Sequence, residues 1–219
     1  EANLHLDYVE PWLFGIRLQG LLSPFARWIQ EAEFHQVNLG AGLTFRREIS
    51  RVDRVSLGLQ SKYVRTTEEG VVPRYTTNNV RLEYTEDSRD DLLNPSDGQF
   101  LQGALEYAGG VLGGRNEFER LTANWHVYLS PADRWTVAAR LKGGEIQPFG
   151  RGPVSRGDTD TLSLSRVPWE ERFRVGGGTT IRGYGEDLVG RRNEAGRAIG
   201  GRVLLLANVE LRFPVFSIV

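Results

Sequence analysis

The stretch RLTANWHVYL, at Arg120–Leu129, alternates apolar and polar side chains along its whole length. Apolar residues occupy the odd-numbered positions, and mostly polar residues occupy the positions between them. Successive side chains of a β-strand point to opposite faces, so this period predicts a strand with one apolar and one polar face. Its length suits a membrane-spanning strand of about 9–11 residues better than a globular strand of about 5–6.

The same alternation recurs along most of the chain, and no helical period competes with it. We predict nine strands, several of them long. They are Asn3–Val9, Phe14–Leu22, Gln36–Arg47, Val55–Tyr63, Val80–Tyr84, Leu101–Tyr107, Arg120–Leu129, Trp135–Lys142 and Arg202–Phe213. The expected fold class is all-β and antiparallel, with no internal linker and no second domain.

Composition excludes several classes of protein. The 219 residues carry a net charge of −1, which gives no basic excess for nucleic acid, and they contain neither Cys nor Met. A disulfide scaffold, a thiolate metal site and a cysteine nucleophile are therefore excluded. No signal peptide and no run of about 18 apolar residues is present. A mean hydropathy of −0.36 is typical of soluble proteins. The strands of a membrane barrel can also give a low mean hydropathy, because their apolar and polar residues alternate.

The predicted connections alternate in length. Three are short, at Glu10–Leu13, Glu48–Asp53 and Ser130–Arg134, and Thr85–Gly98 on the same side is an exception. Four are longer, at Ser23–Phe34, Thr66–Asn78, Gly109–Glu117 and about 147–200. Outer-membrane barrels have short periplasmic turns and long extracellular loops. This rule places the segment 147–200 at the extracellular end.

Within that long connection, Phe173–Leu188 reads FRVGGGTTIRGYGEDL. A glycine run can cradle a phosphate, but that motif needs a helix after it, and no helical pattern follows. The glycines instead predict a tightly folded backbone that presents Arg182. A guanidinium is suited to a carboxylate, and Glu210 lies on the polar face of the last predicted strand. The alternative is a solvated loop arginine.

Other candidate sites are weaker. The acidic segment with Asp87, Asp90, Asp91 and Asp97 could supply calcium ligands, but its spacing does not fit an EF-hand, and turn chemistry is favoured. The three histidines are far apart in the sequence, and no G-x-S-x-G elbow occurs. We therefore expect no metal site, no cofactor and no catalytic residue.

Three segments together resemble one family. RVGGGTTIRGY is similar to the signature of the sixth extracellular loop of BamA/TamA-type outer-membrane assembly proteins, the bacterial surface antigen superfamily. DSRDDLLNPSDG, at Asp87–Gly98, resembles the D-x-R-D…P-x-x-G turn of that family. GGRVLLLANVELRFP, at Gly200–Pro214, resembles the strand that follows the signature loop. The motifs occur in the family's order, and the likeness covers essentially the whole chain.

The resemblance implies a transmembrane barrel of roughly sixteen antiparallel strands, whose signature loop folds into the lumen. It implies that residues 1–219 are part of that barrel, with the remaining strands and the periplasmic POTRA repeats absent. The family's signature-loop positions fall on Gly176, Gly177, Gly178, Ile181, Arg182, Gly183 and Tyr184, with Glu210 as the lumenal partner of Arg182. The acidic periplasmic turn falls on Asp87, Arg89, Asp90, Pro95 and Gly98. A second wall carboxylate expected from the family would lie beyond Val219.

The function implied is the insertion and folding of client β-barrel proteins in the bacterial outer membrane, without enzymatic chemistry. Implied partners are the lipid bilayer, client barrels, and accessory assembly subunits or periplasmic chaperones, with no nucleic acid. A TamA-like or two-partner-secretion translocation pore is the main alternative within the membrane class. A passive porin and a soluble β-sandwich binding module remain further alternatives.

Overall fold

The computed structural model describes residues 2–30, 34–68, 74–150, 167, 171–192, 196 and 198–214. In these ranges, ten strands form one antiparallel sheet. They are β1 (Ala2–His5), β2 (Tyr8–Glu10), β3 (Gln19–Gln30), β4 (Phe34–Glu48), β5 (Asp53–Glu68), β6 (Arg74–Asp87), β7 (Gly98–Ala108), β8 (Phe118–Ala132), β9 (Trp135–Pro148) and β10 (Val203–Arg212). Two single helical turns, η1 (Leu13–Gly15) and η2 (Gly110–Leu112), lie in connections. No helix in the described ranges is long and apolar enough to cross a membrane.

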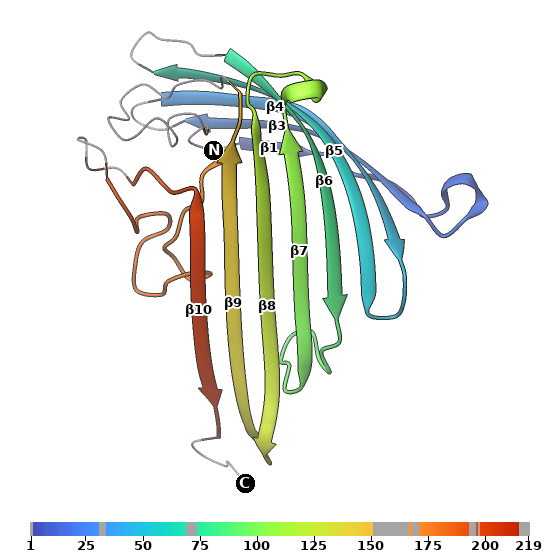
Figure 1. Ribbon diagram of the computed structural model, residues 1–219, viewed down its shortest axis with the longest axis vertical. Coiled ribbons are helices and arrows are strands. Elements are labelled where there is room, and N and C mark those ends of the chain that lie inside the picture. Colours follow the sequence, from blue (N-terminus) through green and yellow to red (C-terminus); the bar gives the residue numbers. More distant parts are fainter. Residues whose placement is uncertain are drawn as a thin grey trace.

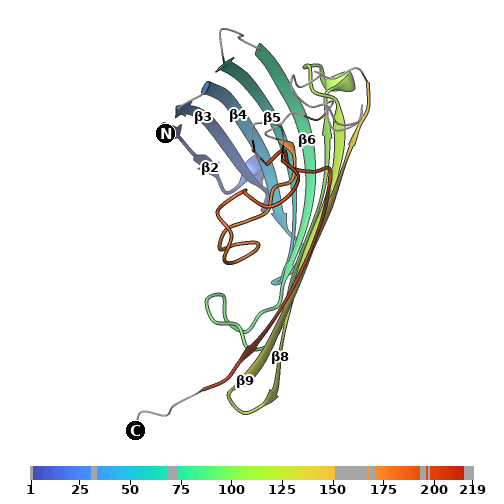
Figure 2. The ribbon, with the colours of Figure 1, turned by 90° about the vertical axis from the view of Figure 1, so that its left-hand side faces the viewer.

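The sheet is a meander, in which each strand from β3 to β10 pairs with the next along the chain. β1 and β2 both pair with β3, so they form one edge of the described sheet and β10 forms the other. The sheet curves into a trough (Figure 1). The described part of the connection after β9 lies on its concave side (Figure 2). The all-β antiparallel architecture predicted from alternation is confirmed.

The two faces of the trough differ in chemistry. Lys62, Arg120 and Arg140 contact the segment held on the concave side, so the polar face is the inner one. The opposite, convex face exposes large apolar side chains on neighbouring strands, among them Leu39, Leu57, Leu82, Leu105, Leu121, Leu141 and Leu205. An apolar band outside and polar residues inside is the arrangement of a membrane barrel wall.

The first strands differ from the prediction. The predicted strand Asn3–Val9 is interrupted and forms β1 and β2, and β3 begins at Gln19 rather than at Phe14. The break lies opposite Ser23, whose hydroxyl donates to Asp7 at 2.6 Å. Phe14 adopts a left-handed backbone (φ 55°) inside η1, which ends the extended pattern expected there.

Two predicted loops are largely strand. β3 continues to Gln30, and Pro24 pairs with Ala41 of β4, so strand replaces residues 23–30 and Phe34 of the predicted connection Ser23–Phe34. In the predicted connection Thr66–Asn78, strand likewise replaces residues 66–68 and 74–78. In both places polar side chains or a proline interrupt the apolar–polar alternation from which strands were predicted. The strand still forms, because the backbone hydrogen bonds between strands do not need apolar side chains. The expected alternation of connection lengths is therefore weaker than the sequence indicated.

The buried apolar core joins the connection after β9 to the inner wall. It consists of Ala108, Phe118, Ile146 and Val167, with Phe173 packed against it. The ring of Phe173 lies on Gly144 of β9, where an added Cβ would come within 2.5 Å of it. Glycine at position 144 lets the ring approach the backbone of the wall. The core thus fixes where the long connection meets the sheet.

Candidate functional site

The long connection is pinned at its base by backbone and side-chain bonds. Phe173 and Gly201 exchange two N–H···O bonds of 2.9 Å, which hold the two ends of the loop together. Beside them the buried Arg172 donates from Nε to the carbonyl of Val167 (3.0 Å) and from Nη1 to that of Ile199 (3.1 Å). One guanidinium therefore ties together three parts of the loop.

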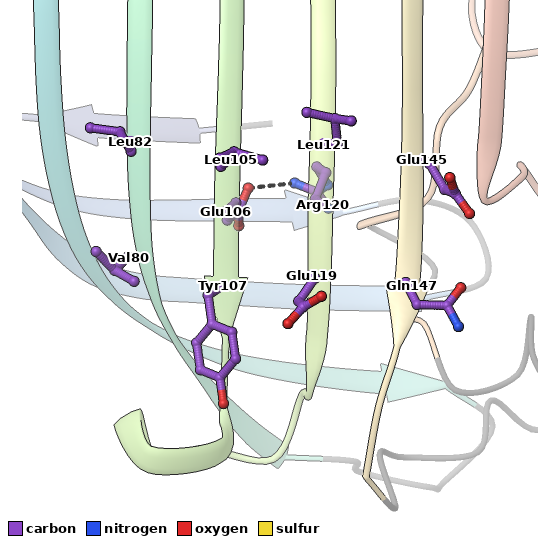
Figure 3. A pocket seen from close by; sticks show the side chains of 10 residues that line it. All are labelled: Val80, Leu82, Leu105, Glu106, Tyr107, Glu119, Arg120, Leu121, Glu145 and Gln147. Carbon is purple, nitrogen blue, oxygen red and sulfur yellow. Dashed lines mark hydrogen bonds and ion pairs between the residues drawn. The ribbon is translucent and has the colours of Figure 1, made fainter.

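Next to this base lies a cluster of charges on the inner wall. The Glu171 carboxylate accepts from Lys62 Nζ at 2.5 Å and from Arg120 Nη2 at 2.8 Å, and its side chain is only 9% exposed. Arg120 also pairs with Glu106 of β7 at 3.1 Å, the contact drawn in Figure 3. Arg81 approaches the same Glu106 at 3.6 Å. The loop is thus joined by ion pairs to β5 and β8, and β8 is joined to β7.

The glycine run folds the loop into a compact turn. Gly176 has φ 130°, and an added Cβ would lie 2.3 Å from the carbonyl oxygen of Gly185. Its N–H donates to Thr180 Oγ1, and the Thr180 hydroxyl donates back to its carbonyl, both at 2.7 Å. The N–H of Gly177 donates to Tyr184 at 3.1 Å. The amides of Gly176 and Gly177 are therefore used inside the loop, where they hold its backbone turn.

The tip of the loop meets β9 and β10. Arg182 Nη2 lies 3.4 Å from Glu210 Oε1, which brings together the two residues singled out in the sequence. The pair is open to solvent, with the side chains 80% and 42% exposed. Arg140 adds a contact from β9, because its Nη1 donates to the carbonyl of Thr179 at 2.8 Å. Of the rest of the tetrapeptide, Ile181 is half-buried, and Gly183 and Tyr184 are exposed.

The acidic turn between β6 and β7 is organised by its own carboxylates. Asp87 accepts two bonds of 2.7 Å from the guanidinium of Arg89. Asp90 accepts from the hydroxyl and N–H of Ser96 and from the N–H of Asp97. The Ser96 hydroxyl, with those N–H groups, holds the pKa of Asp90 well below its usual range. The described residues contain no group of acids and histidines that could hold a metal ion.

This turn is connected to the loop partner through β10. Arg212 Nη2 lies 3.4 Å from Glu210 Oε2, and Arg212 Nη1 donates to the carbonyl of the buried Pro95 at 3.4 Å. The hydroxyl of Ser130 donates to the carbonyl of Ser96 at 2.9 Å. Arg212 therefore lies between the two sites that the sequence predicted separately, the loop arginine and the acidic turn.

Residues 1–219 match the Omp85 superfamily domain along their whole length. The chain belongs to the Omp85 superfamily. It is 29% identical over 132 residues to the outer membrane protein assembly factor BamA of Nitratidesulfovibrio vulgaris, covering 60% of this chain and 15% of that protein. It is 28% identical over 157 residues to a SAM50-like protein of Schizosaccharomyces pombe, covering 64% of this chain and 30% of that protein.

The fold of this Omp85 chain is also that of a solved relative. The crystal structure of BamA from Haemophilus ducreyi lacking POTRA domains 1–3 superposes with a TM-score of 0.83 at 15% identity. The match covers 98% of this chain and 46% of that one. The chain thus spans less than half the length of each of these relatives. Membership of the superfamily makes the chain part of a β-barrel membrane protein.

Sequence reasoning missed the charge cluster of this Omp85 chain. Lys62 and Arg120 fall on the polar faces of the predicted strands Val55–Tyr63 and Arg120–Leu129, but their common partner Glu171 lies 109 and 51 residues away in the sequence. Glu171 is the last acid before the glycine-rich signature, which is the only local signal for it. Arg140 and Arg212 also fall on the polar faces of predicted strands, and the sequence gives no sign of their partners.

The ion pairs of Glu171 predict an acid-sensitive loop. Burial raises the pKa of this carboxyl, but Lys62 and Arg120 outweigh burial and hold it below the ordinary value. Because the pKa of Glu171 is lower in the folded than in the unfolded state, its ion pairs contribute to the free energy of unfolding. This contribution is complete above about pH 4.3, the ordinary pKa of a glutamate, and is lost as the pH falls through the pKa of the folded state. We expect the gap in urea midpoint between wild type and Glu171→Gln to be constant near neutrality and to shrink below about pH 4. A gap independent of pH would contradict this assignment.

Proposed function

We propose that this chain is part of an outer-membrane barrel that inserts and folds client β-barrel proteins, with its IRGY loop bracing the inner wall. The observation that carries the proposal is the docked loop. Its tip reaches Glu210 on β10 and its base is held by Lys62 and Arg120 on β5 and β8. An assembly barrel must open to its client without collapsing. A loop that is attached to the wall at both its base and its tip fixes the curvature of that wall.

The relatives support the same reading. One is named an outer membrane protein assembly factor, and the other is a SAM50-like protein of Schizosaccharomyces pombe. We place this chain in the bacterial outer membrane, with the signature loop at the extracellular end and the turn 88–97 at the periplasmic end. The proposed partners are the bilayer, client barrels and accessory assembly subunits or periplasmic chaperones. Client strands would add to an exposed sheet edge through main-chain hydrogen bonds.

A double-mutant cycle on Arg182 and Glu210 tests the brace. In the full-length protein in lipid vesicles, Arg182→Ala and Glu210→Ala should each slow the folding of an added client barrel. The double variant should be no slower than the worse single variant, because the second change removes nothing further. The coupling in the free energy of unfolding should be about 0.2–1 kcal/mol, since an exposed pair contributes little.

Glu186→Ala, an exposed acid of the same loop, is the control and should leave client folding unchanged. Fully additive single effects would refute the pairing. Ion conductance without client folding would favour a passive porin, and transport of an unfolded soluble polypeptide would favour a translocation pore.

A further inference from the structure

We propose that the turn 11–18, between β2 and β3, inserts its apolar tip into the lipid bilayer beside the barrel wall. The turn, with the sequence PWLFGIRL, projects beyond the strands as the blue segment at the right of Figure 1. Its exposed apolar side chains are Trp12, Phe14 and Ile16, which are 54%, 88% and 49% exposed. Apolar side chains this open at a hairpin tip need a partner outside the described sheet.

One side chain of the turn packs against the apolar, convex side of the sheet. Gly20 pairs with Phe45 and Leu22 with Leu43, on the same apolar face of β3 and β4. The side chain of Leu13 covers Gly20 on that face, because a Cβ added to Gly20 would lie 2.6 Å from Leu13 Cδ1. The tip is therefore continuous with the apolar band that meets lipid, which identifies the bilayer as its partner.

Neither packing nor backbone geometry accounts for phenylalanine at position 14. Its φ of 55° and ψ of 27° place it in the left-handed region, where a bulky side chain is disfavoured and Gly or Asn is common. It is also almost fully exposed. A large ring that is kept in a strained backbone and left almost fully exposed is explained when its partner is hydrocarbon.

The chemistry of the neighbouring residues fits a membrane interface. The guanidinium of Arg17 lies over the ring of Trp12, 5.5 Å from its centroid. Tryptophan favours the headgroup level of a bilayer, and an adjacent arginine can reach lipid phosphate from there. Phe14 would then lie deeper than Trp12. The tip combines a ring for the hydrocarbon with a Trp–Arg pair for the headgroups.

The turn 88–97 at the same end of the sheet provides a matched contrast. Its Leu93 is also apolar and 97% exposed, but this turn is acidic and is tied towards β8 and β10 through Ser130 and Arg212. In Figure 2 this turn projects towards the concave side of the trough and not towards its outer face. Position 93 should therefore face water, whereas position 14 should face lipid.

The test compares spin labels at these two positions. The sequence contains no cysteine, so Phe14→Cys and Leu93→Cys each introduce one labelling site in this region. Full-length protein, free of other cysteines, is reconstituted in vesicles of phosphatidylethanolamine and phosphatidylglycerol. At position 14, relaxation by lipid-soluble oxygen should exceed relaxation by a water-soluble nickel chelate several-fold, and the order should reverse at position 93.

Equal water accessibility at the two positions would overturn the proposal. Shielding of position 14 only after accessory proteins are added would also overturn it, in favour of a protein partner. A second variant separates lipid contact from folding. Phe14→Asn suits the left-handed backbone and should leave the urea midpoint unchanged, while a label at position 16 in this variant should become several-fold more accessible to the nickel chelate.

Discussion

Replacement of Glu171 by alanine is expected to lower the free energy of unfolding by about 3 kcal/mol, towards the lower end of the range for breaking a buried ion pair. The substitution removes the carboxylate that pairs with Lys62. The Lys62 side chain is only 19% exposed, so its charge is left unpaired and largely shielded from water. Arg120 keeps Glu106 at 3.1 Å, which limits the loss. Urea denaturation of the full-length barrel in lipid vesicles, followed by tryptophan fluorescence, measures the change.

Two further variants make this result specific to the cluster. Glu119→Ala removes an exposed glutamate from the outer face of β8, where Figure 3 draws it, and should change stability by less than about 0.5 kcal/mol. Lys62→Met in the Glu171→Ala background removes the uncompensated charge and should recover part of the loss. If Glu171→Ala is no more harmful than Glu119→Ala, the ion pairs do not hold the loop.

Gly176→Ala is expected to undock the signature loop, whereas Gly178→Ala in the same glycine run should be tolerated. At Gly176 the backbone has φ 130°, and a Cβ would come within 2.3 Å of the Gly185 carbonyl oxygen. At Gly178 a Cβ would meet nothing within 4 Å, and its φ lies outside the left-handed region. Strain at one such residue costs about 1–3 kcal/mol, which would shift the docked loop towards the open state by about 5–150-fold.

Limited trypsin cleavage after Arg174 reports on that equilibrium. The Arg174 side chain is 17% exposed in the docked loop, so cleavage requires opening. When opening is fast relative to cleavage, the cleavage rate follows the open population. Gly176→Ala should therefore accelerate cleavage by the same factor as it shifts the equilibrium, and Gly178→Ala should not. Equal rates in the two variants would show that the glycine geometry does not maintain the docked state.

Several features could be predicted from local sequence because they depend on neighbours in the chain. In the segment Leu121–Leu129, for example, the alternation of apolar and polar residues alone assigns each side chain to the outer or the inner face. No knowledge of the neighbouring strands is needed for this assignment. The pattern fails where a strand leaves the apolar band. Pro24 and the polar ends of β5 and β6 were assigned to loops, because the hydrogen-bonded ladder that keeps them extended leaves no mark on side-chain polarity.

The sequence by itself determined the antiparallel all-β class, the polar face that carries Glu210, and the glycine-rich loop that presents Arg182. These follow from side-chain alternation and from backbone freedom at glycine, which are local properties. Only the tertiary structure decided that Glu171 meets Lys62 and Arg120, that Arg212 joins the loop partner to the acidic turn, and that Leu13 packs over Gly20 on the outer face. Those contacts depend on how the sheet curves and where the loop docks, and residues far apart in the chain acquire partners only then.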